Sequence, residues 1–173
     1  MTPAEFPYNP YGVSRARFAV VPRVLVFVTR GDALLLLQRA SHKKLWPGLY
    51  NPPGGHIERD ETPDEAAVRE LQEETGLQVQ SLHLRGLLMA HAQNDLPGVV
   101  VFIYHAQAAG TLHKINDEGT PHWIPFAALD AIPTLPDFNQ LRALVLDQPD
   151  FFTLYKIAHS DGSESVRVVY QRS

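Results

Sequence analysis

The sequence contains no cysteine among its 173 residues. This absence excludes disulfide bonds, thiolate nucleophiles, zinc ribbons and iron–sulfur clusters. Positive charge is also scarce, because 15 Lys and Arg stand against 19 Asp and Glu and leave a net charge of −4. Such a chain lacks the polycationic character of proteins that bind nucleic acid polymers. We therefore expect no nucleic acid partner.

Long apolar segments are missing as well. The longest apolar runs, at 18–28 and 33–37, have the length of strands. They fall short of the ~20 residues that a membrane-spanning helix needs. The first residues show neither the basic region nor the apolar region of a secretory signal. The sequence thus predicts a cytoplasmic protein with no membrane partner.

Apolar residues nevertheless make up 45% of the chain, which is enough for one domain with its own core. We expect an N-terminal arm over 1–16, a domain over 17–150 and a hairpin extension of that domain over 151–173. Proline is unusually common, with 14 residues against 11 glycines. Most of these prolines fall in predicted loops, which favours stiff loops over disorder.

Hydrophobic periodicity predicts a mixed α/β fold with a mostly non-parallel sheet. We expect loops at 40–53 and 115–121 and a C-terminal hairpin that either covers a sheet edge or forms a dimer contact. The chain is accordingly a monomer or a homodimer. The predicted strands are 18–29, 33–39, 79–91, 98–107, 122–124, 152–159 and 165–171, and the predicted helices are 63–75, 126–131 and 139–147.

The helix predicted at 63–75 has clear boundaries. Thr62 is the expected N-cap, Pro63 the first helical residue and Glu65 the partner in a capping box. Gly76 is a natural C-terminal stop. Its predicted apolar face consists of Ala67, Val68, Leu71 and Thr75.

Three glutamates of this helix, Glu70, Glu73 and Glu74, share another face. Like charges at this spacing repel by a few tenths of a kcal/mol per pair, and a helix C-terminus disfavours anions. A hard divalent cation such as Mg²⁺ reverses both effects, because it takes oxygen ligands. The face is therefore either a metal-binding cluster with a general base or simply a solvated acidic surface.

The surrounding segment resembles the Nudix box, G-x5-E-x7-R-E-U-x-E-E-x-G-U with U apolar. The matching residues are Gly55, Glu61, Arg69, Glu70, Leu71, Glu73, Glu74, Gly76 and Leu77. The resemblance implies an α/β/α sandwich around a mixed central sheet, in which the box forms a loop–helix–loop metal site. It also implies hydrolysis of a nucleoside diphosphate linked to another moiety, with Mg²⁺ or Mn²⁺ as the cofactor.

The same resemblance assigns roles to individual box residues. It implies that Glu70, Glu73 and Glu74 bind the metal and that the backbone carbonyl of Gly54 joins them. It implies that Arg69 orients these carboxylates and pairs with Glu61. Gly55, Glu61 and Gly76 are then structural residues of the box.

Segments outside the box are similar to those of MutT-type enzymes, which clear damaged nucleoside triphosphates. Glu118 opens an E-G-x-P-x-x-W pattern, which implies an extra metal ligand or a base; the alternative is an ordinary turn residue. Asn51 lies in a segment similar to one that binds the purine edge in such enzymes, which implies a contact between Asn51 and the base. The alternative is that Asn51 only shapes the loop. Asp137 and Asn139 match base-reading positions, or else cap the helix that follows.

Basic residues near the box are candidates for phosphate contacts. Arg39 and His56 are the predicted substrate-binding residues, and Lys43 and Lys44 are further cations that would neutralise a triphosphate. The alternative for all of them is plain solvation.

Together these features predict a Mg²⁺-dependent Nudix hydrolase that converts a nucleoside triphosphate into the monophosphate and pyrophosphate. An oxidised purine such as 8-oxo-dGTP is the leading substrate, which would place the protein in nucleotide sanitation and DNA repair. The alternatives are a nucleotide sugar, a dinucleoside polyphosphate or a coenzyme as substrate, and a catalytically silent module that binds nucleotides.

Overall fold

The computed structural model describes residues 19–91, 97–112, 117–159, 161 and 163–171. The predicted N-terminal arm, 1–16, lies outside the described residues. Among these residues, eight strands form one mixed sheet, two α-helices pack against it, and the segment Phe126–Ala131 forms a 3₁₀-helix, η1. The strands are β1 (Val20–Arg30), β2 (Ala33–Arg39), β3 (Tyr50–Asn51), β4 (Gln78–His91), β5 (Gly98–Ala109), β6 (Gly119–Pro125), β7 (Phe151–Ala158) and β8 (Glu164–Gln171).

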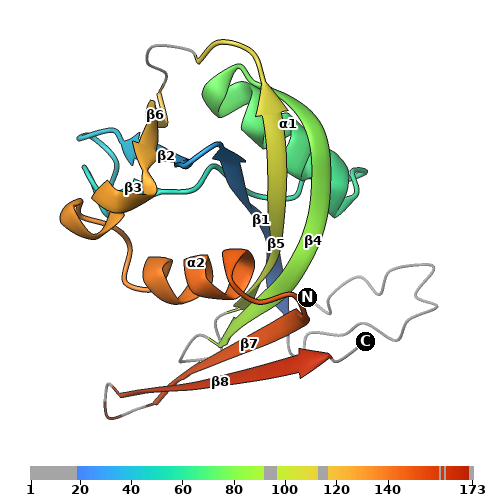
Figure 1. Ribbon diagram of the computed structural model, residues 1–173. Helices are drawn as coiled ribbons and strands as arrows, with labels where there is room; N and C mark the ends of the chain where they lie inside the picture. The colour runs from blue at the N-terminus through green and yellow to red at the C-terminus, as the bar shows by residue number, and fades with distance from the viewer. Residues whose placement is uncertain (1–18, 92–96, 113–116, 160, 162, 172–173) are drawn as a thin grey trace, which may run out of the picture.

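The sheet runs in the order β3-β2-β1-β5-β4-β7-β8, and β6 pairs with β2. The β1–β5 and β4–β7 pairs are parallel, and the other pairs are antiparallel. The helices α1 (Pro63–Thr75) and α2 (Phe138–Leu146) lie on opposite sides of the sheet (Figure 1). This is the predicted α/β/α sandwich, and the fold class is confirmed.

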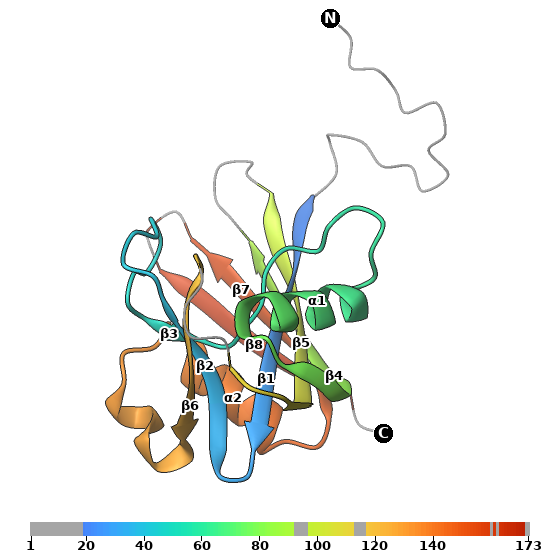
Figure 2. The ribbon, with the colours of Figure 1, turned by 90° about the horizontal axis from the view of Figure 1, so that it is seen from above.

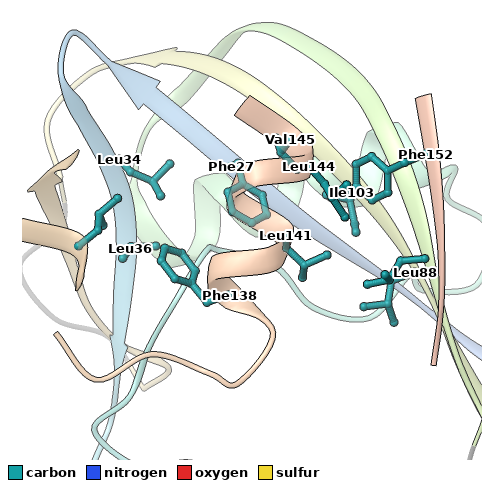
Figure 3. Close-up of a cluster of buried hydrophobic side chains, with 12 residues drawn as sticks. Phe27, Leu34, Leu36, Leu88, Ile103, Phe138, Leu141, Leu144, Val145 and Phe152 are labelled. Carbon is teal, nitrogen blue, oxygen red and sulfur yellow. The ribbon is translucent and has the colours of Figure 1, made fainter. Parts of the chain in front are cut away.

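Alternation along the strands divides the core between the two faces. On β1, Val24, Val26 and Val28 pack with α1, whereas Phe27 points to the other face. There the Phe27 ring stacks on Phe138 of α2, with 6.3 Å between ring centroids (Figure 3). Both faces are therefore apolar, and the central strands lack the polar alternation of a surface strand.

The glycine-rich loop before α1 takes the place of a strand beside β1. β1 and β2 pair only at their turn, through Thr29–Leu34 and Arg30–Ala33. Farther from the turn, Val24 N donates to Gly55 O at 2.9 Å and Val26 N donates to Pro53 O at 2.8 Å. The loop thus lies at the separated end of the β1–β2 hairpin, next to the start of α1.

Several element boundaries differ from the sequence prediction. The strand expected at 122–124 begins at Gly119, because the whole segment pairs with β2. The loop expected at 40–53 ends in the short strand β3, and the helix expected at 126–131 is 3₁₀. The length of β6 and the presence of β3 depend on pairing with β2, which local sequence signals do not reveal.

The predicted C-terminal hairpin is present as β7 and β8, below α2 in Figure 1 and at the far side of the sheet in Figure 2. β7 pairs in parallel with β4 from Gly86 to His91, so the hairpin covers that sheet edge. No helix in the described part of the chain has the length and apolar character to cross a bilayer.

Candidate active site

The helix α1 begins and ends as its local sequence predicts. The Thr62 side chain accepts from Glu65 N at 3.3 Å, and Glu65 accepts from Thr62 N at 2.7 Å, which completes the capping box. Gly76 ends the helix in the left-handed conformation, with φ of 77°. One detail of the apolar face was wrong: Val68 is 39% exposed, and Ala66 is buried in its place.

Glu74 is the most buried of the three helix glutamates, with 5% of its surface exposed. Its Oε2 accepts a hydrogen bond from Gly54 N at 2.9 Å. Burial raises the pKa of Glu74 to about 8, although the Gly54 N–H acts in the opposite direction. The nearby carboxylates of Glu70 and Glu118 raise the pKa of Glu74 further. A positive charge bound in this corner of the site would therefore stabilise the ionised form of Glu74.

Arg69 links four separate acceptors. It binds Glu61 through two nitrogens, at 2.6 and 3.0 Å, and reaches Glu70 at 3.0 Å and Glu73 at 3.2 Å. It also donates to the backbone oxygen of His56 at 3.1 Å. The hydrogen bond from Arg69 lowers the pKa of Glu61 to about 2. This geometry agrees with the predicted pairing of Arg69 with Glu61.

Gly55 leaves the space that Glu70 occupies. A Cβ at this position would lie 2.2 Å from Oε1 of Glu70, closer than real side chains approach. Burial raises the pKa of Glu70, and the ion pair with Arg69 counteracts that rise. Gly54 faces a different obstacle, since its Cβ would lie 2.2 Å from the backbone oxygen of Val24.

Glu118 reaches the same site from the segment just before β6. Its carboxylate accepts from Lys43 Nζ at 2.6 Å, and its backbone oxygen accepts from Ala40 N at 3.0 Å. The following residue, Gly119, passes so close to β2 that a Cβ would lie 2.1 Å from Gln38 O. The 40–49 loop and the Glu118 segment are therefore fixed side by side.

Most of the carboxylates described above, together with Arg69 and the two loop glycines, line one cavity of about 730 Å³. It gathers predicted residues from three parts of the chain and four residues that sequence reasoning did not select. The predicted residues are Arg39, Gly54, Gly55, His56, Arg69, Glu70, Glu73, Glu74 and Glu118, and the additional ones are Arg23, Leu45, Glu58 and Asp117. Arg23 had a detectable signal, because it is a charge inside an apolar run of β1.

The predicted base-reading residues do not line this cavity. Asn51 donates from Nδ2 to the adjacent Pro52 O at 3.0 Å. Asp137 is the N-cap residue of α2, as its alternative role predicted, but its side chain binds Lys156 and makes no capping hydrogen bond. Asn139 lies inside α2 and is exposed. Their proposed contact with a nucleobase stays a prediction.

The donor set fits a hard divalent cation. Across the described residues, no three His, Asp or Glu side chains already stand as a metal-binding group. Arg69, Lys43 and the Gly54 N–H hold the carboxylates in this structure. The cavity still offers glutamate carboxylates, whose oxygens are ligands of the kind that Mg²⁺ prefers, and Gly55 keeps the Glu70 carboxylate unobstructed.

Comparison with protein families gives one match, to the NUDIX domain, over residues 20–147. In structure, the chain is similar to the MutT protein of Bacillus halodurans, with a TM-score of 0.73 and 23% sequence identity. That similarity covers 86% of this chain and 97% of the other. At this identity it shows the shared fold alone.

Two relatives in sequence come from different functional classes. The NAD-capped RNA hydrolase NudC of Pseudomonas aeruginosa is 31% identical over 148 residues, 84% of this chain and 47% of its own. The isopentenyl-diphosphate Delta-isomerase of Roseobacter denitrificans is 35% identical over 129 residues, 66% of this chain and 69% of its own. The chain thus spans about half the length of NudC.

Proposed function

The chain belongs to the NUDIX domain family, and on that basis we propose that it is a divalent-metal-dependent hydrolase of a nucleoside diphosphate derivative. The observation that carries the proposal is the cavity in which Glu70, Glu73, Glu74 and Glu118 converge on the loop at Gly54. Carboxylates at this density suit a site where a metal ion meets the phosphates of a substrate.

We assign the metal to these four glutamates and the backbone oxygen of Gly54. When bound, Mg²⁺ or Mn²⁺ supplies charge neutralisation for the phosphates and a water of lowered pKa. Arg69 keeps the Glu70 and Glu73 carboxylates in place through its hydrogen bonds. A bound cation would also offset the repulsion that like charges at short range exert on one another.

We assign phosphate binding to the basic residues that line the same cavity. Arg23, Arg39 and His56 all line it, and they come from β1, β2 and the glycine loop. A guanidinium matches two phosphate oxygens at once, which suits Arg23 and Arg39 to an anhydride-linked diphosphate. The cavity therefore combines carboxylates for the metal with basic groups for the phosphates.

For a nucleoside triphosphate, the products are the monophosphate and pyrophosphate. We keep 8-oxo-dGTP as the first purine to test, although Asn51 and Asp137 hydrogen-bond within the protein. The similarity to NudC adds a pyrophosphate-linked dinucleotide such as NAD to the candidates. The similarity to an isopentenyl-diphosphate isomerase adds a diphosphate without a nucleoside.

The test is a substrate panel with Mg²⁺, in which released phosphates and monophosphates are measured together with any isomer formed from isopentenyl diphosphate. The panel contains dGTP, 8-oxo-dGTP, NAD, a diadenosine polyphosphate and isopentenyl diphosphate. We expect Mg²⁺-dependent hydrolysis of at least one nucleotide and no turnover of isopentenyl diphosphate. Isomerisation of isopentenyl diphosphate without nucleotide hydrolysis would contradict the proposal.

A matched pair of variants separates the site from general effects. The Glu73 side chain is 60% exposed, so Glu73→Gln should fold normally while removing one carboxylate of the site. We expect a loss of kcat on the order of 100-fold or more. The control is Asp130→Asn, which removes an 80% exposed carboxylate of η1 that does not line the cavity. Unchanged hydrolysis by the Glu73 variant would exclude the metal assignment.

A further inference from the structure

The carboxylate of Asp137 is bound by a lysine from the C-terminal hairpin. Lys156 Nζ on β7 donates to both oxygens of Asp137, at 2.7 and 2.8 Å. Lys156 also lies 3.1 Å from Oε2 of Glu164 on β8. Only 12% of the Lys156 side chain is exposed. A residue beyond the family match at 20–147 thus holds the start of α2.

The segment that contains Asp137 is joined to the strand that leads into the candidate active site. Upstream of Asp137, Pro133 O accepts from Tyr50 N at 2.8 Å, and Thr134 forms a parallel bridge with Tyr50. Tyr50 begins β3, which leads within four residues to Gly54. Gly54 in turn donates to Glu74. Hydrogen bonds at three places, linked by the chain segments 133–137 and 50–54, therefore connect the hairpin to the metal-binding corner.

Charge and burial make the Lys156 contact strong. Burial disfavours the ammonium, but its hydrogen bonds with Asp137 and Glu164 outweigh burial and raise the pKa of Lys156. Charge-assisted hydrogen bonds of this type are about twice as strong as neutral ones. Each Asp137 oxygen keeps a further lone pair, but the carboxylate is bound to Lys156 and does not line the cavity that holds the candidate metal site.

We propose that Lys156 is a positioning residue of the substrate site, which anchors the 132–138 segment through Asp137 and keeps that carboxylate away from the nucleobase. The inference rests on the proposed function, because the 132–138 segment pairs with Tyr50, four residues before the Gly54 loop of that site. It assigns a role to the hairpin and predicts that Asp137 does not discriminate between purines. The nucleotide would then be selected mainly through its phosphates.

The test uses the full chain and three variants. Lys156→Met removes the ammonium, Lys156→Arg keeps a cation, and Arg167→Met is the matched control on the same hairpin. Arg167 lies over the Tyr155 ring at 4.9 Å and has no part in the path to Tyr50. Amide hydrogen exchange at Tyr50 reports the path directly, and kcat and KM are measured for dGTP and 8-oxo-dGTP.

We expect Lys156→Met to speed exchange at the Tyr50 amide and to raise KM, each on the order of 10-fold, with kcat within about two-fold. KM should rise equally for both purines, Lys156→Arg should restore most of the loss, and Arg167→Met should match the wild type. Unchanged exchange at Tyr50 in Lys156→Met overturns the proposal. A fall in KM for one purine alone also overturns it, since Asp137 would then read the base.

Failure of the proposed function gives a different result. If the wild type hydrolyses neither nucleotide, the proposed function loses support, and hydrogen exchange alone decides whether Lys156 fixes the Tyr50 segment. Should Lys156→Met fail to fold, Asp137→Asn removes the charge at the same contact with little change in shape. Faster exchange at Tyr50 in that variant supports the proposal, and wild-type exchange contradicts it.

Discussion

Oε2 of Glu74 lies 2.9 Å from the backbone nitrogen of Gly54, twenty residues earlier in the chain. This hydrogen bond joins the buried end of α1 to the glycine loop that runs beside β1. Within the described residues, the loop has no regular strand partner on the side away from β1, and this hydrogen bond helps to fix its position there. Protonation of the Glu74 carboxylate, or its binding to a cation, should therefore change the hydrogen bond that holds the loop at Gly54.

Gly55→Ala should displace Glu70 while leaving the fold intact. The new Cβ would meet the Glu70 carboxylate at 2.2–2.6 Å, so that side chain must move out of its present position. We expect Mg²⁺ affinity to fall by about 10–100-fold, measured as the Mg²⁺ dependence of hydrolysis.

The control for this variant is Gly31→Ala in the β1–β2 turn. Gly31 has φ of 58° and open space around its Cβ, so alanine costs strain alone. We expect a loss of about 1 kcal/mol in unfolding free energy and unchanged Mg²⁺ dependence. Equal metal affinity in the two variants would show that the Gly55–Glu70 contact is irrelevant.

Arg69→Lys should impair activity although it conserves the charge. A lysine ammonium lacks the planar fork that binds Glu61 through two nitrogens and still reaches Glu70 and Glu73. Activity should drop about 10–100-fold, as for other losses of groups that orient metal ligands. Arg142→Lys, whose arginine pairs with the exposed Asp130 at 3.4 Å, should keep wild-type kinetics.

Glu74 should give the metal-free protein an unusual pH dependence. Its pKa in the folded chain is about 8, above the ordinary 4.5, so folding favours the protonated form. The contribution of Glu74 to stability is therefore complete below about pH 4.5 and is lost as the pH rises through about 8. Urea unfolding in EDTA from pH 5 to 9 measures this loss.

Glu74→Gln supplies the reference for that measurement, because glutamine cannot ionise. The unfolding free energy of the wild type, relative to that of this variant, should fall as the pH rises. Its slope cannot exceed about 1.4 kcal/mol per pH unit for one proton. A difference that is constant with pH would mean that Glu74 is not protonated in the folded, metal-free chain.

Addition of Mg²⁺ should stabilise the wild type more than Glu73→Gln. A ligand that binds only the folded chain at 100 times its Kd adds about 2.7 kcal/mol. Thermal unfolding at increasing Mg²⁺ concentration measures the gain, and Ca²⁺ is a useful comparison because it tolerates longer oxygen distances. Equal stabilisation of the wild type and the variant would indicate binding elsewhere.

The residues of α1 show how much of this protein local sequence can specify. Thr62, Pro63, Glu65 and Gly76 set the limits of the helix through contacts within a few residues, and the structure places them as predicted. The spacing of Glu70, Glu73 and Glu74 follows from helical geometry in the same way. Box residues and the fold class were therefore predictable from the sequence.

The tertiary structure alone decided which residues reach the cavity and which are held elsewhere. Arg23 enters it because β1 lies beside the glycine loop, and Glu118 because Gly119 pairs closely with β2. Asp137 is held by Lys156 across a separation of 19 residues that no local pattern encodes. Short-range hydrogen bonds depend on sequence spacing, whereas these long-range contacts depend on how the sheet brings distant strands together.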